Sequence, residues 1–212
     1  VVNYLSFLML QLETREIHHR VKNNFQIIMS LLNLQESNIE DEKSLKVLRE
    51  PINRINTMAL IHERLYQTDN LSSLDFGEYV KKISMDLFES YMCDPGKVAM
   101  KINVDKCELD VDQAVPCGLI INEVISNSIK YAFPDDWGKP GVIKVILKEK
   151  GDEQVELVLG DDGIGMPDSI VVGKAETLGL NLVPALVKQV KGEYELKRSR
   201  GTEFKISFKK NL

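Results

Sequence analysis

The spacing of apolar residues changes near residue 70, and this change limits the folds that the chain can adopt. Between Leu5 and Gln35 there is no Gly or Pro, and apolar residues recur every three or four positions. A second stretch with this spacing runs over residues 45–59, after a polar break at residues 36–43. Such spacing is typical of helices with one apolar face. Residues 1–70 are therefore predicted to form an antiparallel helical hairpin.

Residues 71–212 combine helical spacing with the alternation that is typical of strands. Helices are predicted over residues 77–92, 110–133 and 178–192. Strands are predicted over residues 97–104, over 141–162 as two strands around a Gly-Asp turn, and over 193–208 as a final hairpin. Strands with helices between and beside them indicate the α+β class, here a helical hairpin followed by an α/β sandwich.

The predicted hairpin has more apolar surface than two helices can bury between them. A second copy that completes a four-helix bundle is the expected partner, so we expect a homodimer through residues 1–70.

Composition excludes some functions and suggests a compartment. The 43% hydrophobic and 28% charged residues are those of a globular protein, and the net charge of -5 argues against a nucleic-acid binder. The 3 cysteines form no C-x-x-C pair, which favours reduced thiols and a cytoplasmic location. Because the chain starts without Met, we expect a fragment of a longer protein. Its first apolar run is too short to cross a bilayer.

One polar cluster falls on the predicted helix 110–133. Glu123, Asn127, Lys130 and Tyr131 follow one another at i, i+4, i+7 and i+8, which places them on one face. A carboxylate, an amide and an ammonium are suited to a hydrated Mg²⁺ ion and the phosphates that it bridges. The same pattern also fits a solvated helix face.

Further polar clusters follow strands or precede helices. In "LGDDGIGMP", Asp161 at a strand end can accept a hydrogen bond from an exocyclic amine, and Gly163 and Gly165 allow close approach to a flat ligand. An ordinary β-turn would have a similar sequence. Gly179 and Leu180 enter the helix 178–192, whose N-terminus is a possible phosphate site, and Gly201 with Thr202 precedes the last strand.

The order of these clusters, E-x-x-x-N-x-x-K-Y, then D-x-G-x-G, then L-G-L, then G-T, resembles the ATP-binding domain of the GHKL superfamily over residues 74–210. The resemblance implies that Asn127 binds Mg²⁺ with Glu123 beside it, that Lys130 reaches the phosphates and that Tyr131 lines the nucleoside. Asp161 would bind the adenine amine, with Gly163 and Gly165 beneath the base. Gly179 and Leu180 would close the phosphate end, and Thr202 would complete the site. Asp162 stands where Asn is common in the family, and Thr177 where Gly is common.

The stretch "EIHHRVKNNFQ" lies on the first predicted helix. At about 100° per residue, His19 points away from the apolar face around Val21 and Ile28, so it is the exposed member of the pair. Adjacent helical residues diverge too far for His18 and His19 to share a metal ion.

Residues 10–67 resemble the dimerisation and phosphotransfer helices of the histidine kinase subgroup with the motif H-R-x-x-N. The resemblance implies that His19 accepts the phosphoryl group and that Asn23 positions a water molecule for dephosphorylation. Many histidine kinases have an acid directly after the histidine, whereas this chain has Arg20, so Glu16 is a candidate for accepting the imidazole proton.

Taken together, the motifs predict the catalytic core of a sensor histidine kinase. Residues 1–70 would form the dimerisation and phosphotransfer domain and residues 71–212 the ATP-binding domain. ATP with Mg²⁺ would phosphorylate His19, and the phosphoryl group would pass to an aspartate of a response regulator. A sensor domain would lie upstream of this chain. Alternatives are a GHKL-type ATPase that uses the hairpin as a clamp, a degenerate nucleotide-binding scaffold, and a Ser/Thr kinase that shares the ATP domain.

Overall fold

The computed structural model describes residues 20–21, 23–67, 74–91, 96–151, 153–174 and 178–211. The chain divides into two compact units, residues 1–72 and 73–212, and each unit is described by itself. None of the helices in the described ranges is long and apolar enough to cross a membrane.

The first unit is a helical hairpin, as predicted. Residues 23–37 are helical, and after a short connection α2 runs over Glu42–Gln67. Asp41 caps α2, because its Oδ2 accepts hydrogen bonds from the backbone N–H of Ser44 at 2.8 Å and from the Ser44 hydroxyl at 2.6 Å. A capping carboxylate satisfies a backbone donor that has no partner within the helix. The acidic break at residues 36–43 therefore both ends the first helix and starts the second.

Several apolar side chains of the first helix remain exposed. Ile27, Leu31 and Leu34 are exposed by 59%, 58% and 62%, and Ile28 by 42%. Exposed apolar surface that is concentrated on one helix is typical of a surface that a further partner covers.

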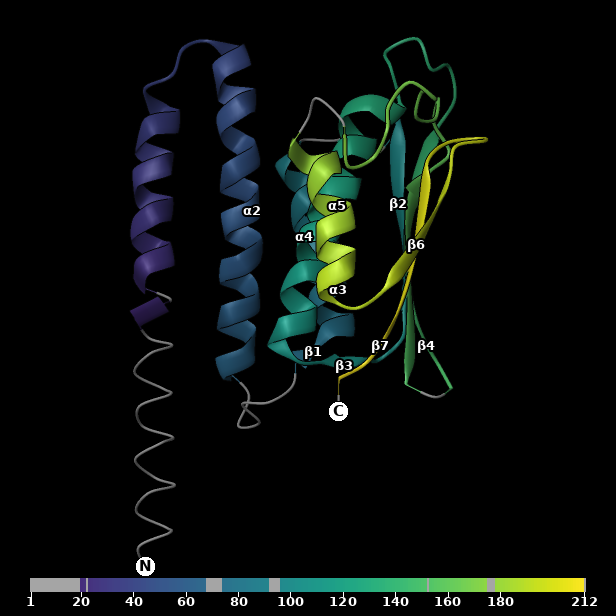
Figure 1. Ribbon diagram of the computed structural model, residues 1–212. Helices are drawn as coiled ribbons and strands as arrows, with labels where there is room; N and C mark the ends of the chain where they lie inside the picture. The colour runs from purple at the N-terminus through teal and green to yellow at the C-terminus, as the bar shows by residue number, and fades with distance from the viewer. Residues whose placement is uncertain are drawn as a thin grey trace, which may run out of the picture. The chain divides into compact units, whose positions relative to one another are not determined.

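The second unit contains a five-stranded sheet (Figure 1). Its strand order is β2-β4-β5-β7-β6, with β2 and β4 parallel and the other neighbours antiparallel. The strands are β2 (Val98–Val104), β4 (Gly141–Lys150), β5 (Gln154–Asp161), β6 (Glu193–Lys197) and β7 (Glu203–Lys209). A small pair, β1 (Leu74–Asp75) with β3 (Glu108–Leu109), lies outside this sheet and was not predicted.

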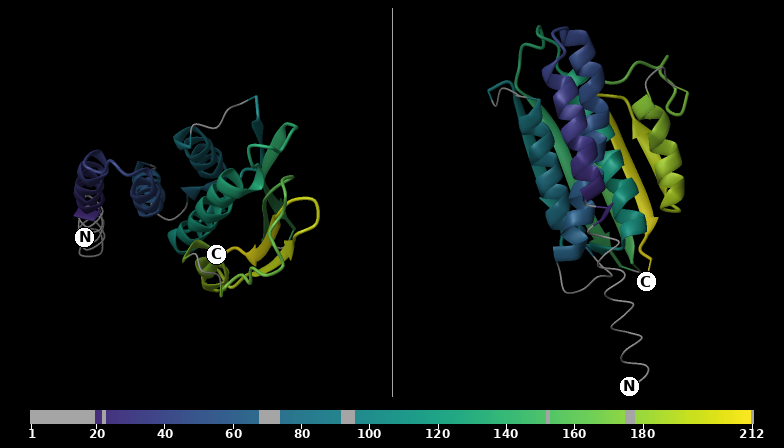
Figure 2. Two further views of the ribbon diagram at one scale, coloured as in Figure 1. Left: turned by 90° about the horizontal axis from the view of Figure 1, so that it is seen from above. Right: turned by 90° about the vertical axis from the view of Figure 1, so that its left-hand side faces the viewer.

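Three helices cover one face of the sheet, as the view from above shows most clearly (Figure 2). They are α3 (Phe76–Ser90), α4 (Val111–Asn127) and α5 (Leu178–Gln189). Inward-facing residues alternate along the strands, so that Val145 of β4, Leu157 of β5 and Ile206 of β7 are fully buried. This two-layer arrangement confirms the predicted α+β class.

The other face of the sheet carries charged pairs. Glu203 of β7 bonds to Lys144 and, at 3.0 Å, to Lys197, and Glu156 of β5 bonds to Lys150 at 2.7 Å. The bond from Lys144 lowers the pKa of Glu203 below its usual value. Polar side chains on the outer face and apolar side chains on the inner face are typical of a sheet that is covered on one side.

The long helix that carries the first polar cluster is held at its start. Asp110 caps α4 by accepting a hydrogen bond from the Gln113 N–H at 2.9 Å. The Gln113 side chain donates to the carbonyl oxygen of Lys209 at 2.7 Å and accepts from the Asn211 N–H at 2.9 Å. These bonds fasten the N-terminus of α4 to the end of β7.

Candidate nucleotide-binding site

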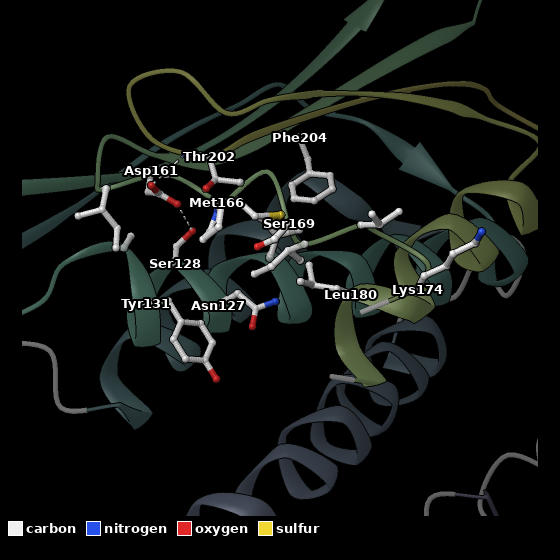
Figure 3. Close-up of a pocket in the computed structure, with 17 residues that line it drawn as sticks. Asn127, Ser128, Tyr131, Asp161, Met166, Ser169, Lys174, Leu180, Thr202 and Phe204 are labelled. Carbon is white, nitrogen blue, oxygen red and sulfur yellow. Dashed lines mark hydrogen bonds between the residues drawn. The ribbon is translucent and has the colours of Figure 1, made fainter. Parts of the chain in front are cut away.

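A cavity of about 830 Å³ opens within the second unit, a volume in the range of small-molecule sites. It lies between the end of α4, the segment after β5, the first turn of α5 and the start of β7 (Figure 3). The described residues that line it are Val124, Asn127, Ser128, Tyr131, Ala132, Asp161, Ile164, Gly165, Met166, Pro167, Ser169, Ile170, Val171, Lys174, Leu180, Thr202 and Phe204.

Asp161 is the most strongly positioned polar group in the cavity. It ends β5 and is only 5% exposed. Its Oδ2 accepts a hydrogen bond from the Ser128 hydroxyl at 2.7 Å, and its Oδ1 accepts from the N–H groups of Gly163 and Thr202, both at 3.1 Å. A carboxylate has about four acceptor sites, so three donors leave it capacity for a donor on a ligand. The site therefore suits a flat molecule with an amino group.

Two glycines allow the backbone to close around this carboxylate. A Cβ on Gly163 would lie 2.1 Å from the carbonyl oxygen of Ala132, to which the Ile164 N–H donates at 2.9 Å. Gly201 has φ of +100°, and a Cβ there would lie 2.0 Å from the carbonyl oxygen of Asp161. The D-x-G and G-T motifs thus mark close backbone contacts, which only Gly can make without a shift.

Replacing Gly163 by Ala is expected to destabilise the second unit, because the new methyl group would overlap the Ala132 carbonyl oxygen. Overpacking of this kind costs about 3 kcal/mol. Gly151→Ala is a matched control, since nothing lies within 4 Å of its Cβ position. Urea unfolding of both variants measures the difference. Equal unfolding midpoints would show that the backbone at Gly163 shifts without cost.

The end of α4 continues as a π-helix, η1 (Ser128–Ala132). Short π-helical turns inside or after α-helices are frequent at functional sites. Asn127 and Tyr131 both line the cavity. The Nδ2 atom of Asn127 is buried without a hydrogen-bond partner among the described residues, and Tyr131 is 58% exposed at the edge of the cavity. An amide with unused hydrogen-bonding capacity can bind a polar ligand.

Glu123 and Lys130, which share the predicted helix face, do not line the cavity within the described part of the chain. Glu123 is buried, and its Oε1 accepts a hydrogen bond from Asn122 at 3.4 Å. The Lys130 ammonium lies 5.7 Å from the ring centroid of Tyr91. Counting at 3.6 residues per turn does not hold through η1, because a π-helix has a wider turn.

The remaining predicted residues of this unit lie as follows. Gly165, Leu180 and Thr202 line the cavity, whereas Gly163 and Gly179 are buried beside it. Gly165 has φ of +81°, a conformation that favours Gly. Asp162 points to the sheet, where its Oδ1 accepts a hydrogen bond from the Val142 N–H at 2.7 Å. In this position an Asn could act as the same acceptor.

Sequence reasoning singled out none of three kinds of cavity residue, although the family resemblance implies a short lid over residues 166–178. Ser128 binds Asp161, Met166 and Ile170 belong to the segment after β5, and Lys174 is a cation at the opposite end of the cavity from Asp161 (Figure 3). A Ser next to Asn127 in an otherwise apolar helix was a weak signal for the first. No periodic pattern marks the others, because the segment after β5 has neither helical nor strand structure.

The predicted phosphotransfer residues are only partly described. His19 and Glu16 lie outside the described residues, whereas Asn23 is exposed on the first helix. Within the described ranges, no group of three or more His, Cys, Asp or Glu side chains could hold a metal ion.

Two family models match the chain. Residues 16–91 match a family described as "Histidine kinase". Residues 112–212 match a family described as "Histidine kinase-, DNA gyrase B-, and HSP90-like ATPase". The second match includes the end of α4, the D-x-G-x-G segment and the G-T pair that surround the cavity.

Curated relatives match nearly the whole chain. The sensor histidine kinase PdtaS of Mycobacterium tuberculosis is 32% identical over 197 residues, which are 89% of this chain and 38% of PdtaS. Blue-light-activated histidine kinase 2 of Erythrobacter litoralis is 25% identical over 189 residues, 86% of this chain and 52% of that protein. The chain thus spans about two fifths to half the length of these relatives.

A solved structure shares the fold. The histidine kinase domain of a blue-light-activated histidine kinase from Erythrobacter litoralis superposes with a TM-score of 0.68 at 24% identity, covering 92% of this chain and 89% of that domain. The two family matches, the curated relatives and the α+β fold agree with one another. The chain belongs to the histidine kinases and corresponds to a histidine kinase catalytic core.

Proposed function

We propose that the cavity binds ATP with the adenine amine on Asp161. The observation that carries this proposal is the buried Asp161 carboxylate, which three protein donors hold in place while acceptor capacity remains for a ligand. Apolar side chains such as Met166, Ile170 and Phe204 offer contacts to the faces of a base. A preorganised acceptor among apolar groups is the usual way in which a protein selects a purine with an amino group.

The phosphates would then extend past Asn127 toward Lys174, which lies at the opposite end of the cavity from Asp161 (Figure 3). The amide oxygen of Asn127 would hold Mg²⁺ together with the phosphates, a ligand set that this ion accepts. Bound Mg²⁺ would neutralise the charge that develops on the phosphate oxygens. Two further roles remain predictions of the sequence: Glu123 would lie beside the metal, and Lys130 would reach the phosphates. It also remains a prediction that Gly179 and Leu180 close the phosphate end of the cavity.

The reaction that we propose is autophosphorylation of His19. A neutral imidazole nitrogen of His19 would form a bond to the γ-phosphorus of ATP while the bond between this phosphorus and the bridging oxygen breaks. ADP leaves, and the proton of the imidazole passes to a base, for which Glu16 is the candidate. Asn23, which is exposed, would position a water molecule when the phosphohistidine is hydrolysed.

The partners follow from the same proposal. Residues 1–70 would form a four-helix bundle with a second copy, and the exposed Ile27, Leu31 and Leu34 support this by giving the bundle an apolar interface. The phosphohistidine would be transferred to an aspartate in a response regulator. Residues 71–212 would bind the ATP that phosphorylates His19.

Incubation with γ-labelled ATP and Mg²⁺ tests this function against its alternatives. Phosphohistidine is expected, so the label on the protein should be lost in acid and kept in alkali. Steady release of phosphate without labelled protein would instead favour an ATPase that uses the hairpin as a clamp. Nucleotide binding with neither product would favour a scaffold, and an acid-stable, alkali-labile label would indicate a Ser/Thr kinase.

A further inference from the structure

Arg198 connects two parts of the second unit that are far apart in the sequence. It follows directly after β6, and its guanidinium donates from Nη1 to the carbonyl oxygen of Pro167 at 2.7 Å and from Nη2 to that of Ile170 at 2.8 Å. The Ile170 N–H also donates to the Pro167 carbonyl at 3.0 Å, so both acceptors belong to one turn. The planar guanidinium, with its donors in a fixed fork, suits such a pair of acceptors.

This turn forms part of the cavity wall. We call residues 166–171 the wall segment; Met166, Pro167, Ser169, Ile170 and Val171 all line the cavity. The wall segment is neither helix nor strand, so it lacks the repeated backbone hydrogen bonds that hold such elements. Its position therefore depends on contacts at particular points.

Among the described residues, backbone contacts flank the wall segment, and the Arg198 side chain bonds to its middle. On one side, Gly165 packs so closely on the carbonyl oxygen of Arg198 that an added Cβ would lie 2.8 Å from it. On the other side, the Gly173 N–H donates to the carbonyl oxygen of Leu180 at 3.1 Å. Between them, the Arg198 side chain is fastened to the turn at Pro167 and Ile170.

We propose that Arg198 is a positioning residue for the nucleotide, a role that rests on the proposed ATP site. It is not among the described residues that line the cavity, so it acts through the wall segment. By holding Pro167 and Ile170, it places the apolar contacts of the wall against the base before ATP binds. Without these bonds, ATP would have to order the wall segment as it binds, and affinity would fall by the entropy of that ordering.

Replacing Arg198 by Met keeps an apolar side chain of moderate length and removes both donors. In the otherwise unchanged chain, we expect the KM for ATP to rise about tenfold and kcat at saturating ATP to change by less than about twofold. Without nucleotide, the backbone amides of the wall segment should exchange hydrogen about tenfold faster, while those of β5 and β7 stay unchanged. Arg198→Lys should give a KM for ATP and an exchange rate between those of wild type and of Arg198→Met, because an ammonium can donate hydrogen bonds but lacks the planar fork of donors.

Arg200→Met is the matched control, because Arg200 lies exposed in the same connection between β6 and β7. Arg200→Met should keep the wild-type KM for ATP, and the backbone amides of the wall segment should exchange hydrogen at the wild-type rate. If wild-type protein binds ATP and Arg198→Met retains its KM, the inference is wrong, whether or not exchange rises. Faster exchange throughout β5 and β7 would also overturn it, since Arg198 would then stabilise the whole unit. If wild-type protein does not bind ATP, the proposed function itself fails.

Discussion

Replacing His19 by Ala is expected to abolish phosphorylation of the chain by ATP. The imidazole is the proposed acceptor, and an Ala side chain offers no nucleophile, so labelling should fall by at least about 10³-fold. The measurement is transfer of label from γ-labelled ATP in the presence of Mg²⁺. Binding of ATP should be unchanged, because the cavity is formed by residues of the second unit.

His18→Ala is the control for this experiment. On the helix that the sequence predicts for this stretch, neighbouring residues point about 100° apart, so the prediction is that only one of His18 and His19 can meet the nucleotide. We expect His18→Ala to be labelled at a rate within a few-fold of wild type. Label that persists in His19→Ala and disappears in His18→Ala would assign the acceptor to the other histidine. Label that persists in both variants would place the phosphoryl acceptor outside this pair of histidines.

Replacing Asp161 by Asn is expected to weaken ATP binding by about 10²-fold, the effect of losing one well-positioned hydrogen bond in a buried site. The Asn carbonyl oxygen can still accept from the N–H groups of Gly163 and Thr202, which hold Oδ1 in the wild type. Its NH₂ group then takes the place of Oδ2, where it would face the amine of adenine donor to donor. Titration with ATP by calorimetry measures the loss.

Asp162→Asn provides the matched control, with the same chemical change one residue along the chain. The Asp162 side chain accepts a hydrogen bond from the Val142 N–H, and an Asn carbonyl oxygen can accept the same bond. Affinity for ATP should therefore stay within about threefold of wild type. Equal losses in both variants would show that charge near the end of β5, and not the position of one acceptor, sets the affinity.

Much of the fold could be predicted because local patterns and tertiary packing agree. The spacing of apolar residues predicted the hairpin, and the acidic break at residues 36–43 contains Asp41, the residue that caps α2. Alternation along residues 141–162 predicted β4 and β5, whose inward side chains are fully buried. In each case the side-chain period is a direct consequence of backbone geometry, so it can be recognised without the structure.

Candidate site residues could be recognised from the sequence where backbone geometry, or a place at a strand end, requires a particular residue type. Asp161 ends β5, and Gly163 and Gly201 stand where a Cβ would meet a backbone oxygen. The face shared by Glu123 and Lys130 was counted on an ideal α-helix. The helix changes to a π-helix after Asn127, so this count does not extend to Lys130. Of the four described residues in the cluster, Asn127 and Tyr131 line the cavity, whereas Glu123 and Lys130 do not.

The sequence by itself determined the two helices of the hairpin, the α+β class of the second unit and the motifs that identify its carboxylate and glycines. Each of these depends on a local spacing or on a single residue's conformational freedom. Only the tertiary structure decided that Ser128 reaches Asp161 across 33 positions and that Arg198 reaches Pro167 across 31. Such contacts form when distant segments pack together, and neither partner carries a local pattern that would reveal the other.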